Sequence, residues 1–271
     1  MRADLHAHTS ASDGSLSPSS LVSLALRVPL DVLAITDHDS VAGVPEALEA
    51  ARGTALTLVP GVELSAVWEG RDVHILGYFV DYRDERLLAH LTDLRAARVR
   101  RAETTVAALK EAGYEISLDD VLSLAEGGAV GRSHVARALV NGGHADTVTE
   151  AFRQLLGRGC PFYVPKDVRS PIEVLEVILS AGGVPVLAHP GVTKADDVIP
   201  TLVGSGLMGI EAYHAEHSPS DRDRYAWLAR SLGLIATGGS DYHGPEAPKQ
   251  DLGSVTVPTV EVDRLLSLAP R

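Results

Sequence analysis

Short apolar runs, most of which end in a histidine or an acidic residue, recur along this chain and constrain its fold. The predicted strands are residues 3–6, 31–36, 55–59, 73–80, 183–188, 209–213 and 234–237. Most are followed by an amphipathic helical pattern, which indicates β/α alternation. The turn Glu69-Gly70-Arg71 predicts a hairpin, and hence an antiparallel strand at residues 73–80. Together these patterns predict an α/β fold, a distorted seven-stranded (β/α) barrel.

Charged, helical periodicity replaces the strand pattern between residues 84 and 164. Residues 86–112 predict one long helix, with shorter ones at 118–124, 133–140 and 148–156. Because the strand pattern resumes afterwards, we interpret residues 84–164 as a helical insertion, or cap domain. Residues 1–83 and 165–271 then form the barrel.

The charge balance and the lack of long apolar runs exclude some classes of function. Acidic residues exceed basic ones by 36 to 24, which argues against charge-driven binding to duplex nucleic acid. A small phosphorylated ligand, held at a local positive site, stays compatible with this charge. No apolar run approaches the roughly 20 residues that span a bilayer, and the start does not resemble a secretory signal. With Cys160 as the lone cysteine, we expect a cytoplasmic protein without membrane contact.

Imidazoles and carboxylates gather where the strands end, which is where the active site of a β/α barrel lies. His6 and His8 stand two apart after a strand and project to one side, and Asp13 follows in a Ser/Gly-rich turn. The candidate metal ligands are His6, His8, Asp13, His38, Glu63, His74, His189, Asp241 and His243. Each alone is more simply explained as a loop hydrogen-bonder or a cap, but nine converging titratable groups are costly to bury without metal. They predict two or three divalent cations, with Mn, Fe and Zn all compatible.

Six motifs carry these residues, in order, through almost the whole chain. They are Asp4-Leu-His-Ala-His-Thr-Ser-Ala-Ser-Asp-Gly, Thr36-Asp-His, Gly61-Val-Glu, Val73-His-Ile-Leu-Gly, Ala188-His-Pro and Gly239-Ser-Asp-Tyr-His. Together they resemble the PHP (polymerase and histidinol phosphatase) phosphoesterases. The resemblance implies a trinuclear site with one metal held by His6, His8, Glu63 and Asp241, a second by Glu63, His74 and His189, and a third by Asp13, His38 and His243.

The same resemblance implies substrate contacts beyond the metal ligands. The implied contacts are Arg132 and His134 in the insertion, Lys166 where the insertion returns to the barrel, and His214 and His217 after a strand. An arginine fork and a lysine point charge both suit phosphate. Solvated surface charge and helix packing are the alternatives for these residues. His217 or a metal-bound water is the candidate acid for the leaving group.

The resulting hypothesis is hydrolysis of a phosphomonoester by a metal-bridging hydroxide, with Glu63, Asp13 and Asp241 as the catalytic carboxylates. The insertion resembles the nucleotide-acting branch of the family, which favours the 3′-phosphate of a nucleoside 3′,5′-bisphosphate as the scissile group. The alternatives are a histidinol-phosphate-type phosphatase and a 5′–3′ exonuclease on short single-stranded RNA. A non-catalytic, metal-stabilised binding module is the rival outside enzymes, and an intact set of nine ligands disfavours it.

Overall fold

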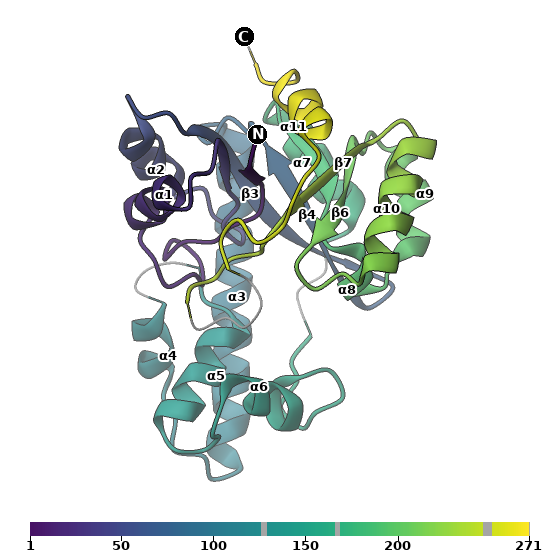
Figure 1. Ribbon diagram of the computed structural model, residues 1–271. Coiled ribbons are helices and arrows are strands. Elements are labelled where there is room, and N and C mark those ends of the chain that lie inside the picture. Colours follow the sequence, from purple (N-terminus) through teal and green to yellow (C-terminus); the bar gives the residue numbers. More distant parts are fainter. Residues whose placement is uncertain (126–128, 166–168, 246–250, 271) are drawn as a thin grey trace. The chain divides into compact units, whose positions relative to one another are not determined.

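The computed structural model describes residues 1–125, 129–165, 169–245 and 251–270 (Figure 1). The chain divides into two compact units, which we call the barrel unit (Met1–His90 and Val168–Arg271) and the insertion unit (Leu91–Asp167). The insertion unit begins seven residues later and ends three residues later than the predicted boundaries 84 and 164.

Seven strands form a single sheet in which each strand pairs with its neighbours in sequence. They are β1 (Ala3–Asp4), β2 (Val32–Ile35), β3 (Thr57–Trp68), β4 (Arg71–Tyr78), β5 (Val184–Leu187), β6 (Gly209–His214) and β7 (Ile235–Gly239). Strand β4 is antiparallel to both β3 and β5, and the other pairs are parallel. The backbone N–H of Leu5 donates to Gly238 and that of Asp241 to His6, so the first and last strands join and the sheet nearly closes. The predicted distorted seven-stranded barrel is therefore confirmed.

Helices follow most of the parallel strands. Those of the barrel unit are α1 (Pro18–Arg27), α2 (Val44–Ala51), α7 (Pro171–Ser180), α8 (Pro190–Thr193), α9 (Ile199–Gly204, after a 3₁₀ turn at Asp196–Val198), α10 (Pro219–Ser231) and α11 (Thr259–Leu266). Helix α3 (Glu85–Glu111) begins in the barrel unit and continues into the insertion unit, which also contains α4 (Leu118–Leu124), α5 (Arg132–Asn141), α6 (Val148–Ala151) and a π-helical segment at Phe152–Leu156. Ser17, Ser170 and Ser218 each cap a helix whose first turn begins with proline, which is why these starts are readable from sequence.

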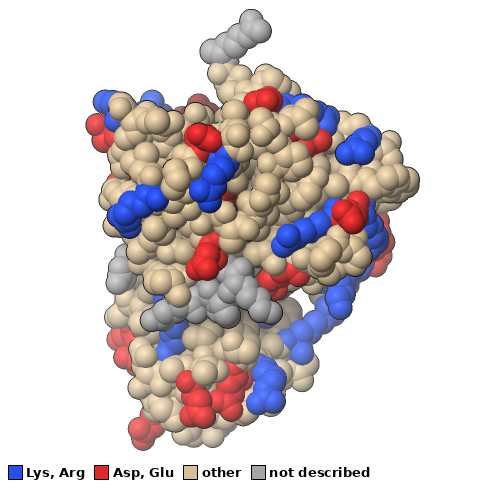
Figure 2. Space-filling view, in the orientation of Figure 1, with Lys and Arg blue, Asp and Glu red and all other residues tan. Residues whose placement is uncertain are grey.

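Each unit has its own apolar core. In the barrel unit the inward faces of the strands contribute residues such as Ala34, Leu76 and Val186. The insertion unit packs its helices around a separate cluster that includes Leu109 and Leu139. No helix within the described ranges is both long enough and apolar enough to cross a membrane. On the face in Figure 2 the described acidic and basic side chains are interspersed.

Strand β3 differs from its prediction. We expected a strand at residues 55–59 with Glu63 just past it, but β3 runs to Trp68 and contains Glu63. The first part of β3 pairs with β2 and the second part with β4, so β3 continues beyond the point where β2 ends. Gly61 lies at this change of partner, and a Cβ there would come within 2.9 Å of the carbonyl oxygen of Ile35. Glu63 therefore reaches the C-terminal edge of the parallel strands, and so does the first half of the antiparallel β4, which contains His74.

Candidate metal centre and active site

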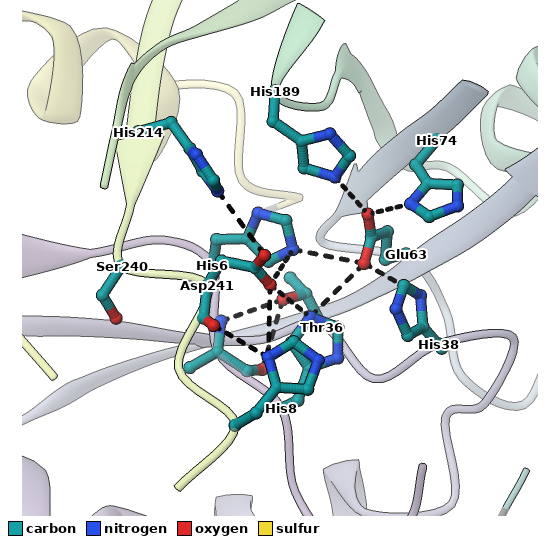
Figure 3. A network of polar contacts seen from close by, with 12 residues as sticks. His6, His8, Thr36, His38, Glu63, His74, His189, His214, Ser240 and Asp241 are labelled. Atoms are coloured by element: carbon teal, nitrogen blue, oxygen red, sulfur yellow. Dashed lines mark hydrogen bonds and ion pairs between the residues drawn. The ribbon is translucent and has the colours of Figure 1, made fainter. Parts of the chain in front are cut away.

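Five of the predicted histidine ligands surround the carboxylate of Glu63, which is fully buried (Figure 3). Its Oε1 atom lies 2.7 Å from Nδ1 of His74 and 2.9 Å from Nε2 of His189. Its Oε2 atom lies 2.9 Å from Nδ1 of His38 and 3.2 Å from Nε2 of His6. One carboxylate thus faces imidazoles that come from four separate segments of the barrel.

Two further carboxylates complete the cluster. Oδ1 of Asp241 lies 3.1 Å from Nε2 of His8 and 3.4 Å from Nε2 of His6. Oδ1 of Asp13 lies 3.3 Å from Nε2 of His243 and 3.9 Å from Nδ1 of His8. All nine predicted ligands therefore lie in one connected cluster of the barrel unit.

The donor set fits divalent cations. Three groups in this cluster have ligand atoms close enough to share an ion: His6, His8, Glu63 and Asp241; His38, Glu63 and His74; and His8, Asp13, His38 and His243. Both ring nitrogens of His8 and Nδ1 of His38 are buried, and none of the described residues gives them a hydrogen bond of good geometry. Such buried lone pairs need a partner, and mixed imidazole and carboxylate donors suit Mn, Fe and Zn. How many ions bind, and which metal, stays a prediction.

The cluster is electrostatically coupled. Burial raises the pKa of the Glu63 carboxyl, but the charges of His38, His74 and His6 outweigh burial and hold that pKa well below its usual value. Conversely, burial lowers the pKa of His243, yet Asp13 and Asp241 raise it to about 10. The carboxylates are therefore held ionised, with positive charge required beside them.

Buried carboxylates also shape the loops that carry the ligands. Asp37 accepts hydrogen bonds from the backbone N–H and hydroxyl of Thr9 and from the hydroxyl of Ser12, each at 2.7 Å, and so fixes the turn that leads to Asp13. The backbone at His189 and at Asp241 is left-handed, with φ of +27° and +55°. Such conformations cost free energy and persist only where the surroundings enforce them, which is typical of functional sites.

Glu211, on β6, belongs to the site but was not among the predicted residues. It is fully buried, and its carboxylate contacts Nδ1 of His6 and the backbone N–H of His189. The signal that would have found it is an acidic residue between Ile210 and Ala212 within the strand Gly209–His214, since buried charges are rare unless paired.

The implied substrate residues of the insertion unit have different environments. The guanidinium of Arg132 lies 5.8 Å from the ring centroid of Phe152 and 5.5 Å from that of Tyr163. His134 is buried, and its Nδ1 accepts the backbone N–H of Gly131 at 2.9 Å, which caps α5. Lys166 lies outside the described residues. The substrate roles of all three stay predictions, and the capping bond favours the packing alternative for His134.

His214 and His217 are both buried at the barrel site. Nδ1 of His214 accepts the backbone N–H of Glu216, and its Nε2 lies 3.5 Å from Oδ2 of Asp241. In His217, Nδ1 lies 2.9 Å from the carbonyl oxygen of Ala212 and Nε2 accepts the N–H of Gly191. Both ring nitrogens of His217 are thus occupied by backbone groups, so one of these bonds must open before His217 can contact substrate or donate a proton.

The barrel and its ring of imidazoles and carboxylates define a metal-dependent phosphoesterase. The family model for the PHP domain matches residues 4–158, and the chain belongs to the PHP family. It is 38% identical to the 5′-3′ exoribonuclease Rnm of Escherichia coli over 92% of this chain and 87% of that protein. It is 34% identical to the 3′,5′-nucleoside bisphosphate phosphatase of Chromobacterium violaceum over 92% of this chain and 90% of that one. A crystal structure from Bifidobacterium adolescentis, described as a metal-dependent phosphoesterase, superposes with a TM-score of 0.92 at 34% identity and covers 99% of this chain and 96% of that chain.

Proposed function

We propose that this enzyme removes the 3′-phosphate from nucleoside 3′,5′-bisphosphates with a cluster of divalent cations. The observation that carries the proposal is the convergence on Glu63 of imidazoles from separate segments, beside Asp241 and Asp13. The similarity to a named bisphosphate phosphatase over nearly the full length of both chains supports this choice of substrate.

The residues present would hold up to three cations. One set of donors that could share a cation consists of His6, His8, Glu63 and Asp241. Glu63 would be shared with a second set through Oε1, which faces His74 and His189. Bound cations supply Lewis acidity, which acidifies water and neutralises charge on a phosphate.

The chain's own residues would then position the ester. Three carboxylates, those of Glu63, Asp13 and Asp241, are held ionised and would fix the positions of the cations. The phosphate of the substrate would then bind at positions that these carboxylates leave open. No protein nucleophile is required in this proposal. Arg132, whose guanidinium lies over two aromatic rings, is suited to hold a second phosphate because such packing orients the planar fork in advance.

Trimming of short RNA from the 5′ end is the second candidate. The observation that favours it is the 38% identity to a protein named as a 5′-3′ exoribonuclease. Both candidates use a nucleotide with a 5′-phosphate, and they differ in whether the bond that is cleaved is a monoester or a diester. A histidinol-phosphate-type activity needs no second phosphate contact and is the weakest of the three. The cytoplasmic location also stays a prediction.

A substrate panel tests the proposal. Phosphate or nucleotide release is measured from adenosine 3′,5′-bisphosphate, adenosine 3′-monophosphate, histidinol phosphate and a 5′-phosphorylated RNA trinucleotide, with Mn²⁺ or Zn²⁺ added to chelator-treated protein. We expect the highest kcat/KM for the bisphosphate, well above that for the 3′-monophosphate. Equal values for the two adenosine substrates would contradict a second phosphate contact, and release only from RNA would replace the proposal by its second candidate.

A further inference from the structure

Glu211 bridges two of the expected metal ligands from behind. Its Oε1 and Oε2 atoms lie 3.0 and 3.2 Å from Nδ1 of His6. Its Oε2 atom also accepts the backbone N–H of His189 at 2.8 Å. Because its side chain is fully buried, water does not compete for these contacts.

The contact with His6 decides which ring nitrogen of that histidine is available to a metal. A carboxylate accepts a hydrogen bond, so the nitrogen that faces Glu211 carries the proton. In the neutral ring the other nitrogen, Nε2, then has its lone pair free, and Nε2 is the atom that faces Glu63 at 3.2 Å and Asp241 at 3.4 Å. A carboxylate behind a metal-binding histidine fixes its tautomer and makes it a stronger ligand.

The contact with His189 acts on the backbone instead of the ring. His189 has φ of +27°, a conformation that a residue with a Cβ adopts at a cost in free energy. The hydrogen bond from its N–H to Glu211 offsets part of that cost. The ring of His189 leaves this turn with Nε2 2.9 Å from Oε1 of Glu63.

We propose that Glu211 is a positioning residue that sets the tautomer of His6 and the turn of His189. The rival is that Glu211 is itself a metal ligand, since it forms a possible donor group with His6 and His214. The backbone N–H of His189, which Oε2 of Glu211 accepts at 2.8 Å, argues against the rival, because a cation bound to that oxygen would compete with this donor. The proposal rests on the metal cluster of the proposed function and is independent of which phosphate ester is cleaved.

The Glu211→Gln variant tests whether Glu211 acts on metal binding, and the protonation of His6 in the wild type separates a positioning role from a ligand role. An amide has one acceptor oxygen. If that oxygen takes the place of Oε2, the N–H of His189 keeps its acceptor, but the NH₂ group then stands where Oε1 lies 3.0 Å from Nδ1 of His6 and disfavours a proton on that nitrogen. In the reverse placement the N–H of His189 loses its acceptor. Glu261→Gln is the matched control: Glu261, on α11, also accepts a backbone N–H, that of Ala236 at 3.2 Å, and contacts no expected ligand. Zn²⁺ affinity is measured by competition with a chromophoric chelator, beside the thermal midpoint of the metal-free proteins.

We expect Glu211→Gln to bind one Zn²⁺ roughly 10- to 100-fold more weakly, the usual effect of removing a group that orients a ligand. Glu261→Gln should bind as the wild type does. Wild-type Zn²⁺ affinity in Glu211→Gln would overturn the proposal. If weakened Zn²⁺ binding accompanies a wild type that cleaves none of the nucleotides, the proposed substrate fails and this inference stands.

A measurement on the wild type keeps the inference falsifiable if the variant does not fold. Long-range ¹H–¹⁵N correlation spectra of Zn²⁺-loaded, ¹⁵N-histidine-labelled protein report which nitrogen of His6 carries the proton, with assignment by loss of the signal in His6→Asn. We expect the proton on Nδ1, with its resonance shifted downfield by the carboxylate. A proton on Nε2, or none on either nitrogen, would overturn the proposal, and the second result would identify Glu211 as part of a metal site.

Discussion

The barrel unit and the insertion unit bury different kinds of side chain. At the mouth of the barrel His6, His8 and Glu63 are completely buried, although all three are ionisable. Among the described residues of the insertion unit, the buried polar side chains are Thr105 and His134, and each bonds to backbone of its own helix or cap. The insertion core is otherwise aliphatic and aromatic.

We interpret this difference as a division of roles, with the reaction in the barrel unit and the selection of substrate in the insertion unit. Buried ionisable groups cost folding free energy unless they pair with each other or with a metal. The cluster therefore lowers the stability of the metal-free barrel unit. The described residues of the insertion unit include no comparable buried cluster of ionisable groups, and the candidate contact Arg132 is half-buried, with its guanidinium 5.8 and 5.5 Å from two aromatic ring centroids. We therefore expect changes in the barrel to stop turnover and changes in the insertion to alter substrate preference.

Removal of the metals should give the largest effect. Chelation should abolish turnover and speed amide hydrogen exchange in the barrel strands, because the ionised carboxylates would lose the cations that offset their charge. A cation present at 100 times its Kd stabilises by about 2.7 kcal/mol, which corresponds to roughly a hundredfold change in exchange. Exchange measured by mass spectrometry on peptides of β1, β3 and β7 should rise, and peptides of α4 and α5 serve as the internal control. Equal acceleration in both units would break the comparison.

Loss of a single predicted metal ligand should come next. Asp13→Ala and His243→Ala each remove one member of a pair whose atoms lie 3.3 Å apart. We expect kcat to fall by roughly a hundredfold or more, the order seen when one group that stabilises transition-state charge is lost. Phosphate release from the bisphosphate measures it, with Asp31→Ala, at an exposed aspartate of the barrel unit, as the control. A kcat within twofold of the wild type would remove this pair from the mechanism.

These ligands could be read from the sequence because each one follows a local signal. The His6-x-His8 pair, the Asp-His after β2 and the Gly-Ser-Asp after β7 all stand next to recognisable strands, and a barrel brings such ends together. Glu63 lies in the cluster, as the sequence predicted, but within β3 and not past the end of a strand at residues 55–59. The length of β3 depends on its exchange of pairing partners from β2 to β4, which no local pattern records.

The support behind the ligands was harder to predict. Glu211 approaches His6 across 205 positions of the chain, and Asp37 reaches Ser12 across 25. Contacts of this kind follow from tertiary packing and leave little trace in local periodicity. His217 is a local signal with a different outcome. Its position after a strand predicts a functional side chain, whereas its ring nitrogens contact the backbone carbonyl of Ala212 and the backbone N–H of Gly191.

A change at Arg132 should affect selection more than turnover. Loss of a charge-assisted hydrogen bond to phosphate costs about 1.5–3 kcal/mol, so Arg132→Ala should raise KM for the bisphosphate roughly 10- to 100-fold with a smaller change in kcat. Arg132→Lys should recover only part of this, since an ammonium lacks the planar face that stacks on Phe152 and Tyr163. Arg137, five residues along α5 on another face of that helix, provides the control Arg137→Ala.

Steady-state kinetics on the bisphosphate and on adenosine 3′-monophosphate measure this effect. The loss should be confined to the bisphosphate if Arg132 holds the second phosphate. An equal loss on both substrates would show that the insertion contributes to the reaction at the metal cluster itself, and the separation of chemistry from selection would fail.

The smallest effect is expected at Asp197, a charged residue of the barrel unit that lies on its surface. Asp197 accepts a bidentate contact from Arg71 at 2.6 and 2.5 Å and the indole N–H of Trp68 at 2.9 Å, and so secures the tip of the β3–β4 hairpin. These donors lower the pKa of its carboxyl from 3.8 to about 2. Because the folded pKa is the lower one, the stabilisation is present above pH 3.8 and is lost as the pH falls through 2.

Asp197→Asn should therefore destabilise the protein slightly at pH 7, since exposed ion pairs are screened by solvent, and the difference from the wild type should shrink between pH 4 and pH 2. Urea titrations followed by the fluorescence of Trp68 measure this, in a Trp227→Phe background that removes the other indole. A large loss of unfolding free energy at pH 7, or a difference from the wild type that persists unchanged to pH 2, would contradict this expectation. The Asp197–Arg71 pair would then contribute to stability as strongly as a buried ion pair does. Burial would then not be what distinguishes the charges at the barrel mouth from those on its surface.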